Sequence, residues 1–517
     1  MTKIRVLRWF TLALARSRER FRLVKLSEWK RSSAVLLLCA ASAIAAPAQT
    51  FKTLVSFDYT DGAIPFGLVQ GTDGNFYGAT DKGGNGANNN CNVSCGSIFK
   101  ITPGGTLTTV HAFDGTDGNG PSGLVLATSG NFYGAATYGG THNCDSYGST
   151  GPCGTVFEMT PAGALTTLHD FCSKGSCADG AIPWGVLIQA TNGNFYGTTV
   201  AGGAGSCGST VGPGCGTVFE ITAKGVLTTL HTFSGTDGAY PYGGLVQATN
   251  GNFYGTTSYG GANGYGTVFE ITAKGVLTTL HNFTGNDGGY PFGGLVQASN
   301  GSFYGTTSAN SGLLLTGGGP SCTGSGIGFG TAFEITSAGK LTTLHGFANT
   351  DGAYPYGTLV QATDGNFYGP TSCGGASNNG TLFKITSKGT LTSLYSFGGP
   401  DGSFPYAGLI QSTNGTLYGT AVVGGTDNDG TVFSLSVGLG PFVETNPTSG
   451  KVGASVIILG NKLTGATAVS FNGAAATFTV ISSTEIKTTV PTDATTGTVE
   501  VTTPSGTLKS NVAFRVP

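Results

Sequence analysis

The stretch GLVQATNGNFYGTT, residues 244–257, decides the fold, because the chain repeats close variants of it along most of its length. Seven copies are present, and they begin at Gly67, Gly123, Gly185, Gly244, Gly294, Gly357 and Gly408. Six of them end in Phe-Tyr-Gly and the last ends in Leu417-Tyr418-Gly419. A segment repeated at this length indicates a fold built from stacked copies of one supersecondary unit.

Each unit contains three more recurring phrases, typified by DGAYPYG, GTVFEIT and LTTLHTF. The phrases LVQAT, FYGTT, TVFEIT and LTTLHTF are rich in β-branched, aromatic and aliphatic residues, so each predicts a strand. The short NGN and AKG connections predict hairpin turns. Successive Asp-Gly loops come as close as 50 residues, as between Asp237 and Asp287. Four antiparallel strands in such a period are typical of a β-propeller blade, so the sequence predicts an all-β chain with a seven-bladed propeller over residues 51–438.

The array of repeats begins and ends partway through a repeat. FKTLVSF (Phe51–Phe57) is a fourth-strand phrase that has no first three strands before it. GTVFSLSVG (Gly430–Gly438) is a third-strand phrase that has no fourth strand after it. The sequence therefore predicts that the N-terminal strand pairs with Thr431–Leu435, completes the seventh blade and closes the ring.

The segment 441–517 has no cysteine and no copy of the repeat, and its period-2 strands predict a small antiparallel β-sandwich. It resembles the IPT/TIG immunoglobulin-like family through Pro447, Ser449-Gly450, Gly453, Gly460, Leu463, Gly465, Phe471-Asn472-Gly473, Val490-Pro491 and Thr503-Pro504. The resemblance implies a spacer or interaction module and identifies no ligand.

The repeats themselves resemble the GloVer tandem repeats of exported bacterial proteins, through segments such as Gly67-Leu68-Val69 and Gly244-Leu245-Val246. Gly-Gly doublets, for example at Gly260, also resemble those of kelch propeller blades. These resemblances imply a surface or secreted protein with kelch-like blades, and they imply no activity.

The N-terminal 48 residues read as an export signal. A basic region is followed by the short apolar run Ala34–Ala46 and the small-residue site Ala46-Pro47-Ala48. This part holds ten of the 24 Lys+Arg and two of the 26 Asp+Glu, so the mature chain has 14 basic and 24 acidic residues and a net charge of −10. We therefore expect a secreted or cell-surface protein that binds no nucleic acid and has no membrane span in its mature form.

Ten cysteines remain after the signal, and in an exported protein disulfides are the first interpretation. The candidates are Cys91, Cys95, Cys144, Cys153, Cys172, Cys177, Cys207, Cys215, Cys322 and Cys373. No pair has C-x-x-C spacing, so zinc is disfavoured, and the connectivity stays open.

An aromatic residue follows the proline of six Asp-Gly-x-x-Pro loops: Phe66, Trp184, Tyr242, Phe292, Tyr356 and Tyr406, with Ser122 in the seventh. Exposed rings would suit stacking on sugars, whereas buried rings would pack between blades. We expect the Asp of each loop to accept hydrogen bonds from its own turn, and His111, His169, His231, His281 and His345 to be packing residues. Neither series predicts a metal site.

No catalytic motif, cofactor motif or metal-binding loop stands out, because the chain repeats like groups instead of combining unlike ones. The leading hypothesis is a non-catalytic binding protein whose propeller face takes an extracellular glycan or a surface protein, without a cofactor. The first alternative is an extracellular polysaccharide lyase or hydrolase that uses insertions such as Ser308–Gly330. The second is a purely structural envelope protein.

Overall fold

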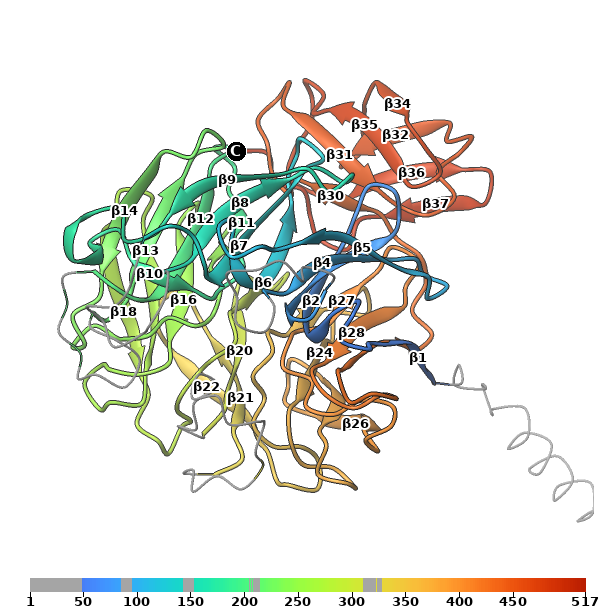
Figure 1. Ribbon diagram of the computed structural model, residues 1–517. Helices are drawn as coiled ribbons and strands as arrows, with labels where there is room; N and C mark the ends of the chain where they lie inside the picture. The colour runs from blue at the N-terminus through green and yellow to red at the C-terminus, as the bar shows by residue number, and fades with distance from the viewer. Residues whose placement is uncertain are drawn as a thin grey trace, which may run out of the picture. The chain divides into compact units, whose positions relative to one another are not determined.

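The computed structural model (Figure 1) describes residues 49–84, 95–142, 153–203, 205, 207, 214–309, 322 and 328–517. Within these residues the secondary structure is almost entirely antiparallel strand, and the helical structure is limited to the 3-10 turn η2 (Gly175–Cys177). No helix in the described part is long and apolar enough to cross a membrane. The predicted export signal, residues 1–48, lies outside the described residues.

The repeats form seven sheets, which we number 1 to 7 in chain order. Sheet 1 contains β2 (Ala63–Gln70), β3 (Phe76–Lys82), β4 (Ser97–Ile101) and β5 (Leu107–Ala112); sheet 2 contains β6 (Asn119–Leu126), β7 (Phe132–Tyr138), β8 (Thr155–Met159) and β9 (Leu165–Asp170). Sheet 3 contains β10 (Ala181–Pro183), β11 (Ile188–Gln189), β12 (Phe195–Ala201), β13 (Thr217–Ile221) and β14 (Leu227–Thr232).

The remaining repeat sheets have shorter first strands. Sheet 4 contains β15 (Val246–Gln247), β16 (Phe253–Thr257), β17 (Thr267–Ile271) and β18 (Leu277–Asn282); sheet 5 contains β19 (Val296–Gln297), β20 (Phe303–Thr307), β21 (Thr331–Ile335) and β22 (Leu341–Gly346). Sheet 6 contains β23 (Val360–Gln361), β24 (Phe367–Thr371), β25 (Thr381–Ile385) and β26 (Leu391–Ser396); sheet 7 contains β27 (Ile410–Gln411), β28 (Leu417–Ala421), β29 (Thr431–Ser436) and the N-terminal strand β1 (Thr50–Ser56).

Sheet 7 is built from both ends of the repeat array. β1 pairs antiparallel with β29, from Thr50 opposite Ser436 to Ser56 opposite Thr431. This is the pairing that the phase of the repeat predicts, and β1 takes the edge position that β5, β9 and their equivalents take in the other sheets.

One of the aromatic pairs between neighbouring sheets recurs along the array. The tyrosine of each Phe-Tyr-Gly packs on the phenylalanine of the next: Tyr77–Phe132 (4.3 Å), Tyr133–Phe195 (3.8 Å), Tyr196–Phe253 (4.1 Å), Tyr254–Phe303 (4.1 Å) and Tyr304–Phe367 (4.0 Å) between ring centroids. Tyr368 shares a buried cluster with Leu417, which replaces phenylalanine in the last copy.

The same contacts link the last sheet to the first. Tyr418 of sheet 7 packs on Phe76 of sheet 1 at 4.1 Å between ring centroids. The amide of Thr413 donates to Oε1 of Gln70 at 3.0 Å, as the amide of Thr249 donates to Gln297 between sheets 4 and 5. The series of sheet contacts thus returns to its starting point.

The C-terminal segment forms two further four-stranded antiparallel sheets. One contains β30 (Glu444–Asn446), β31 (Ser455–Leu459), β35 (Glu485–Thr489) and β34 (Phe478–Val480); the other contains β33 (Ala474–Ala475), β32 (Ala468–Phe471), β36 (Val499–Thr503) and β37 (Gly506–Lys509). Their inner faces share one buried cluster, in which Ile458 and Ile486 of one sheet accompany Phe471 and Val501 of the other. This is the alternation expected of sheets that are apolar on one face.

Candidate functional site

The six aromatic residues that follow the loop prolines line one cavity of about 390 Å³, together with Ser122 of the seventh loop. Tyr242 and Phe292 are buried, and the other four aromatic side chains are partly buried. Val186, also in the lining, is 40% exposed, so the cavity is open to solvent. The cavity therefore gathers equivalent positions from all seven repeats.

The rings contact one another around the cavity, mostly edge to face. Their centroid distances are 5.8 Å for Phe66–Trp184, 6.2 Å for Trp184–Tyr242, 5.0 Å for Tyr242–Phe292, 5.1 Å for Phe292–Tyr356 and 5.3 Å for Tyr356–Tyr406. Trp184 contacts Phe66 although the loop of Ser122 comes between them in the sequence. Such pairs contribute about 0.5–1.5 kcal/mol each beyond their area burial, so they also fix the shape of the cavity.

Glycines bring the repeats together at the cavity. A β-carbon on Gly243 would lie 2.8 Å from the carbonyl oxygen of Gly293, and one on Gly408 would lie 2.5 Å from that of Thr358. Real β-carbons do not approach backbone that closely, so any other residue would push neighbouring repeats apart. Close packing against a neighbouring repeat therefore requires glycine at positions such as Gly243 and Gly408.

The residue before each loop proline has a left-handed backbone in all seven repeats: Ile64, Gly120, Ile182, Tyr240, Tyr290, Tyr354 and Phe404, with φ between 55° and 65°. For a β-branched residue such as Ile64 this conformation is strained, and such strain persists only where the surrounding structure holds it. Here a hydrogen bond holds each loop to the preceding repeat, as when Tyr240 N–H donates to the carbonyl of Cys215 at 2.9 Å. Sequence reasoning missed this position, although its side chains vary less than those of ordinary loops.

Four tyrosines extend the aromatic surface outward from the cavity. Tyr259 contacts Tyr240 at 5.6 Å and Tyr290 at 5.1 Å between ring centroids, and Tyr290 contacts Tyr265 at 5.6 Å. Tyr259, Tyr265 and Tyr290 are partly buried, so part of each ring faces solvent. We call these four residues the tyrosine cluster. Burial raises the pKa of Tyr259 to about 12, so its hydroxyl is a hydrogen-bond donor at neutral pH.

Tyr242 joins the cluster to the cavity. Its side chain is 3% exposed, and its hydroxyl has no hydrogen-bond partner among the described residues. Burial raises its pKa well above the usual value, with a further contribution from nearby Tyr259. An unpaired buried hydroxyl costs about 1–3 kcal/mol of stability.

The residues that line the cavity include no Asp, Glu, His, Lys, Arg or Cys. Its polar side-chain groups are tyrosine hydroxyls, the hydroxyls of Ser122 and Thr358 and the indole N–H of Trp184, beside backbone amides. A hydrolase or lyase needs a positioned acid and base. Most of the insertion Ser308–Gly330, on which the enzymatic alternative depends, lies outside the described residues.

The predicted packing histidines each bind the aspartate of the adjacent Asp-Gly loop. Nε2–Oδ2 distances are 2.8 Å for His111–Asp117, 3.0 Å for His169–Asp179, 2.8 Å for His231–Asp237, 2.9 Å for His281–Asp287 and 3.0 Å for His345–Asp351. Tyr395 replaces histidine beside Asp401. The second oxygen of Asp237 accepts the amide of Ser234 at 2.8 Å, which is the turn contact predicted for this series.

These pairs predict an acid-sensitive contribution to stability. Burial would raise the pKa of Asp237, but hydrogen bonds from Ser234 and His231 outweigh it and lower the pKa below its usual value. The stabilisation is then fully present above the unfolded-state pKa near 3.9 and is lost as the pH falls through the lower folded-state pKa. We expect Asp237→Asn to lower the free energy of unfolding by about 2 kcal/mol at pH 7 and by much less at pH 2.5.

Urea unfolding at several pH values measures this difference. Asp493→Asn is the matched control, because Asp493 is exposed in the C-terminal segment. A difference between wild type and Asp237→Asn that stays constant down to pH 2.5 would show that the carboxylate charge is not responsible.

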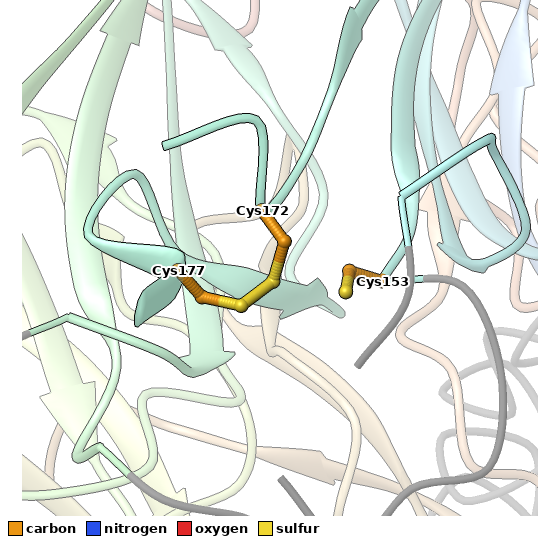
Figure 2. Close-up of side chains that lie close together, drawn as sticks. All are labelled: Cys153, Cys172 and Cys177. Atoms are coloured by element: carbon orange, nitrogen blue, oxygen red, sulfur yellow. A yellow bond between two sulfur atoms is a disulfide. The ribbon is translucent and has the colours of Figure 1, made fainter. Parts of the chain in front are cut away.

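All eight described cysteines are in disulfides. The described pairs are Cys172–Cys177, Cys207–Cys215 and Cys322–Cys373; Cys95 and Cys153 are also disulfide-bonded, and Cys91 and Cys144 lie outside the described residues. Figure 2 shows Cys153 beside the Cys172–Cys177 disulfide; the three sulfur atoms lie within 4.8 Å of one another. Because all three are oxidised, they offer no thiolate to a metal.

The disulfides flank the cavity loops. Cys95, Cys153 and Cys215 each accept, through the backbone carbonyl, the amide of the residue before a loop proline. The disulfides thus stabilise the segments on which the strained loops rest, and they are compatible with a location outside the cytoplasm.

Comparison with known structures gives several distant likenesses. A fungal alcohol oxidase of the AA5 family, in complex with copper, is 12% identical with a TM-score of 0.49, over 90% of this chain and 98% of that chain. Putative 6-phosphogluconolactonases from Bacteroides uniformis ATCC 8492 and Bacteroides fragilis NCTC 9343 are 16% and 18% identical, with TM-scores of 0.42 and 0.41. The matches cover 64% and 71% of this chain and 86% and 90% of the two lactonase chains. At these scores none of them informs the function.

No curated protein matches the chain. The model of the Gloeobacter/Verrucomicrobia repeat matches it three times, over residues 42–211, 95–317 and 318–481. These matches span most of the chain and include all seven copies of the phrase that opens the repeat. The chain belongs to the Gloeobacter/Verrucomicrobia repeat family.

Proposed function

We propose that this chain is an exported binding protein with a kelch-like seven-bladed β-propeller over residues 51–438. An IPT/TIG-like immunoglobulin module over residues 441–517 follows it, and residues 1–48 are the export signal. The propeller is supported by seven repeat sheets, by one type of aromatic contact between neighbours, and by the return of that contact from Tyr418 to Phe76. A closed ring leaves no blade face uncovered.

We place the ligand at the mouth of the central cavity and over the tyrosine cluster. The observation that carries this proposal is the convergence of six aromatic rings on one solvent-open cavity whose lining has no acid–base pair. The volume is in the range of small-ligand pockets, and rings with hydroxyl groups suit a sugar unit, which has an apolar face and a polar rim. The function is therefore binding of an extracellular glycan without catalysis, at the cell surface or in the surrounding medium.

The proposal predicts opposite effects of Tyr242→Phe on stability and on binding. Loss of the unpaired hydroxyl will raise the free energy of unfolding by about 1 kcal/mol, since it removes a desolvated group that has no partner. The same change will weaken glycan binding about fivefold, because a ligand hydroxyl loses its partner. Trp184→Ala will weaken binding tenfold or more, as is usual for an aromatic residue central to a binding site.

A glycan array on the mature protein identifies a ligand, and calorimetric titration of the variants then measures the effects. Tyr304→Phe is the matched control, because Tyr304 also loses one hydroxyl but its partner is Asn300 in the NGN-type turn. Binding that is absent across the array, or that is insensitive to Trp184→Ala, would refute the site. If Tyr304→Phe weakens binding as much as Tyr242→Phe does, the proposed position of the binding site is wrong.

A further inference from the structure

The second Asp-Gly loop departs from the other six on both sides of its proline. It has Gly120 before the proline, where the others have isoleucine, tyrosine or phenylalanine, and Ser122 after it, where the others have an aromatic residue. This loop therefore supplies no ring to the cavity, and Phe66 and Trp184, from the loops on either side of it, contact each other at 5.8 Å between ring centroids. Ser122 lies in the lining of the cavity.

The first repeat departs from the others at Asp81. The equivalent residues are Thr137, Val200, Ser258, Ser308, Ser372 and Val422, none of which has a charge. Two of the serines bond to the next loop: Ser258 donates to the carbonyl of Pro291 at 2.7 Å and Ser372 to that of Pro405 at 3.3 Å. An ionised carboxylate has no proton to donate, so Asp81 cannot make this bond.

The two departures meet in space. A β-carbon on Gly120 would lie 2.6 Å from Oδ1 of Asp81 and 3.9 Å from Cδ2 of Tyr138. Glycine at position 120 thus makes room for the carboxylate beside the loop that carries Ser122. Tyr138 packs against the same buried cluster as Tyr242, whose unpaired hydroxyl belongs to the cavity.

Among the described residues, none donates a hydrogen bond to the carboxylate of Asp81, although its side chain is partly buried. Burial raises its pKa, and the positive charge of neighbouring Lys82 offsets only part of this effect. Burial also raises the pKa of Tyr138, with a further contribution from Asp81. A desolvated carboxylate of this kind is stabilised most by a bound cation.

We propose that Asp81, with Tyr138 and Tyr242, forms a subsite for an ammonium group beside Gly120, in the loop that carries Ser122. The unpaired carboxylate supplies the counter-charge, and the faces of aromatic rings attract cations. The lining has no basic residue that would repel one. The inference rests on the proposed glycan-binding function and specifies its ligand as a glycan with a free amine, that is, an amino sugar.

Calorimetric titration of the mature protein with three probes tests this subsite. The probes are a glucosamine tetramer, the matched neutral N-acetylglucosamine tetramer and the free diamine putrescine. The glucosamine tetramer will bind at least tenfold more tightly than the neutral tetramer. Asp81→Asn will bring the two affinities to within about twofold of each other, whereas Asp493→Asn will leave the ratio unchanged. Asparagine is isosteric, and thermal unfolding will show that the variant is folded.

The outcomes separate this inference from the proposal on which it rests. Equal binding of both tetramers to the wild type, or an unchanged ratio in Asp81→Asn, would overturn the ammonium subsite. The proposal of glycan binding would still stand in that case, provided that Trp184→Ala abolishes the binding seen with the wild type. Putrescine binding that exceeds tetramer binding and is lost in Asp81→Asn would support the subsite and make a free amine its ligand. No binding of any probe would overturn the subsite, and the array would decide the glycan proposal by itself.

Discussion

A mature chain that begins at Asp58 will fail to fold cooperatively, whereas one that begins at Gln49 will fold as the full-length chain does. The shorter chain lacks β1 and Phe57, which is fully buried and whose amide donates to Gly430 at 3.0 Å. It also lacks Phe51, whose ring stacks on Tyr395 at 3.7 Å between centroids. The missing segment carries four apolar side chains that pack against neighbouring strands. Their loss lowers the free energy of unfolding by roughly 6 kcal/mol or more, which is comparable to the total stability of a typical domain.

Urea unfolding followed by fluorescence and circular dichroism measures this effect. A synthetic peptide of residues 49–57 will restore folding to the shorter chain, because it can pair with the exposed edge of β29. A chain from Asp58 that unfolds with the wild-type midpoint would show that the β1–β29 pairing does not contribute to stability.

Phe76→Ala and Phe303→Ala will destabilise the protein by equal amounts, about 3–5 kcal/mol each. Both phenylalanines are fully buried, and each packs on a tyrosine of the preceding sheet at 4.1 Å between ring centroids. Phe303 lies between sheets 4 and 5, in the middle of the array, while Phe76 lies where sheet 7 meets sheet 1. In a closed ring these positions are equivalent.

An open stack would respond differently. Phe76 would then lie in a terminal repeat. Phe76→Ala would promote local unfolding of that repeat and would change the unfolding of the other repeats much less. Equilibrium unfolding with a probe in the first repeat and another in the fifth distinguishes the two cases. A small or local effect of Phe76→Ala beside a large global effect of Phe303→Ala would contradict closure.

Much of the fold was predictable because the same sequence pattern of strand and turn residues occurs seven times. The strands follow from the residue types of the repeated phrases, and the hairpin turns follow from the short connections between them. The pairing of β1 with β29 follows from the incomplete repeats at the two ends of the array. All three are observed. The first strand was predicted too long in the later repeats: Val246–Gln247 and its equivalents have two residues. The glycines just before them are packed against neighbouring backbone at the cavity and form no strand ladder there.

The candidate site was harder to predict, because its residues come from seven separate loops. The sequence identified the aromatic series but left its placement between packing and exposure. Tyr242 and Phe292 are buried as the packing interpretation expects, yet the whole series lines a solvent-open cavity. The proximity of Asp81 to Gly120 could not be read from spacing, because it depends on how two neighbouring repeats approach each other.

The seam between β1 and β29 also sets an order of assembly. β1 is made before any other described strand and finds its partner β29 in the last repeat, so sheet 7 cannot be completed before synthesis of the array ends. Until then β1 has no partner strand, and its apolar side chains have no sheet to pack against. A prematurely terminated product would leave β1 unpaired, and an unpaired strand can pair with other chains and cause aggregation.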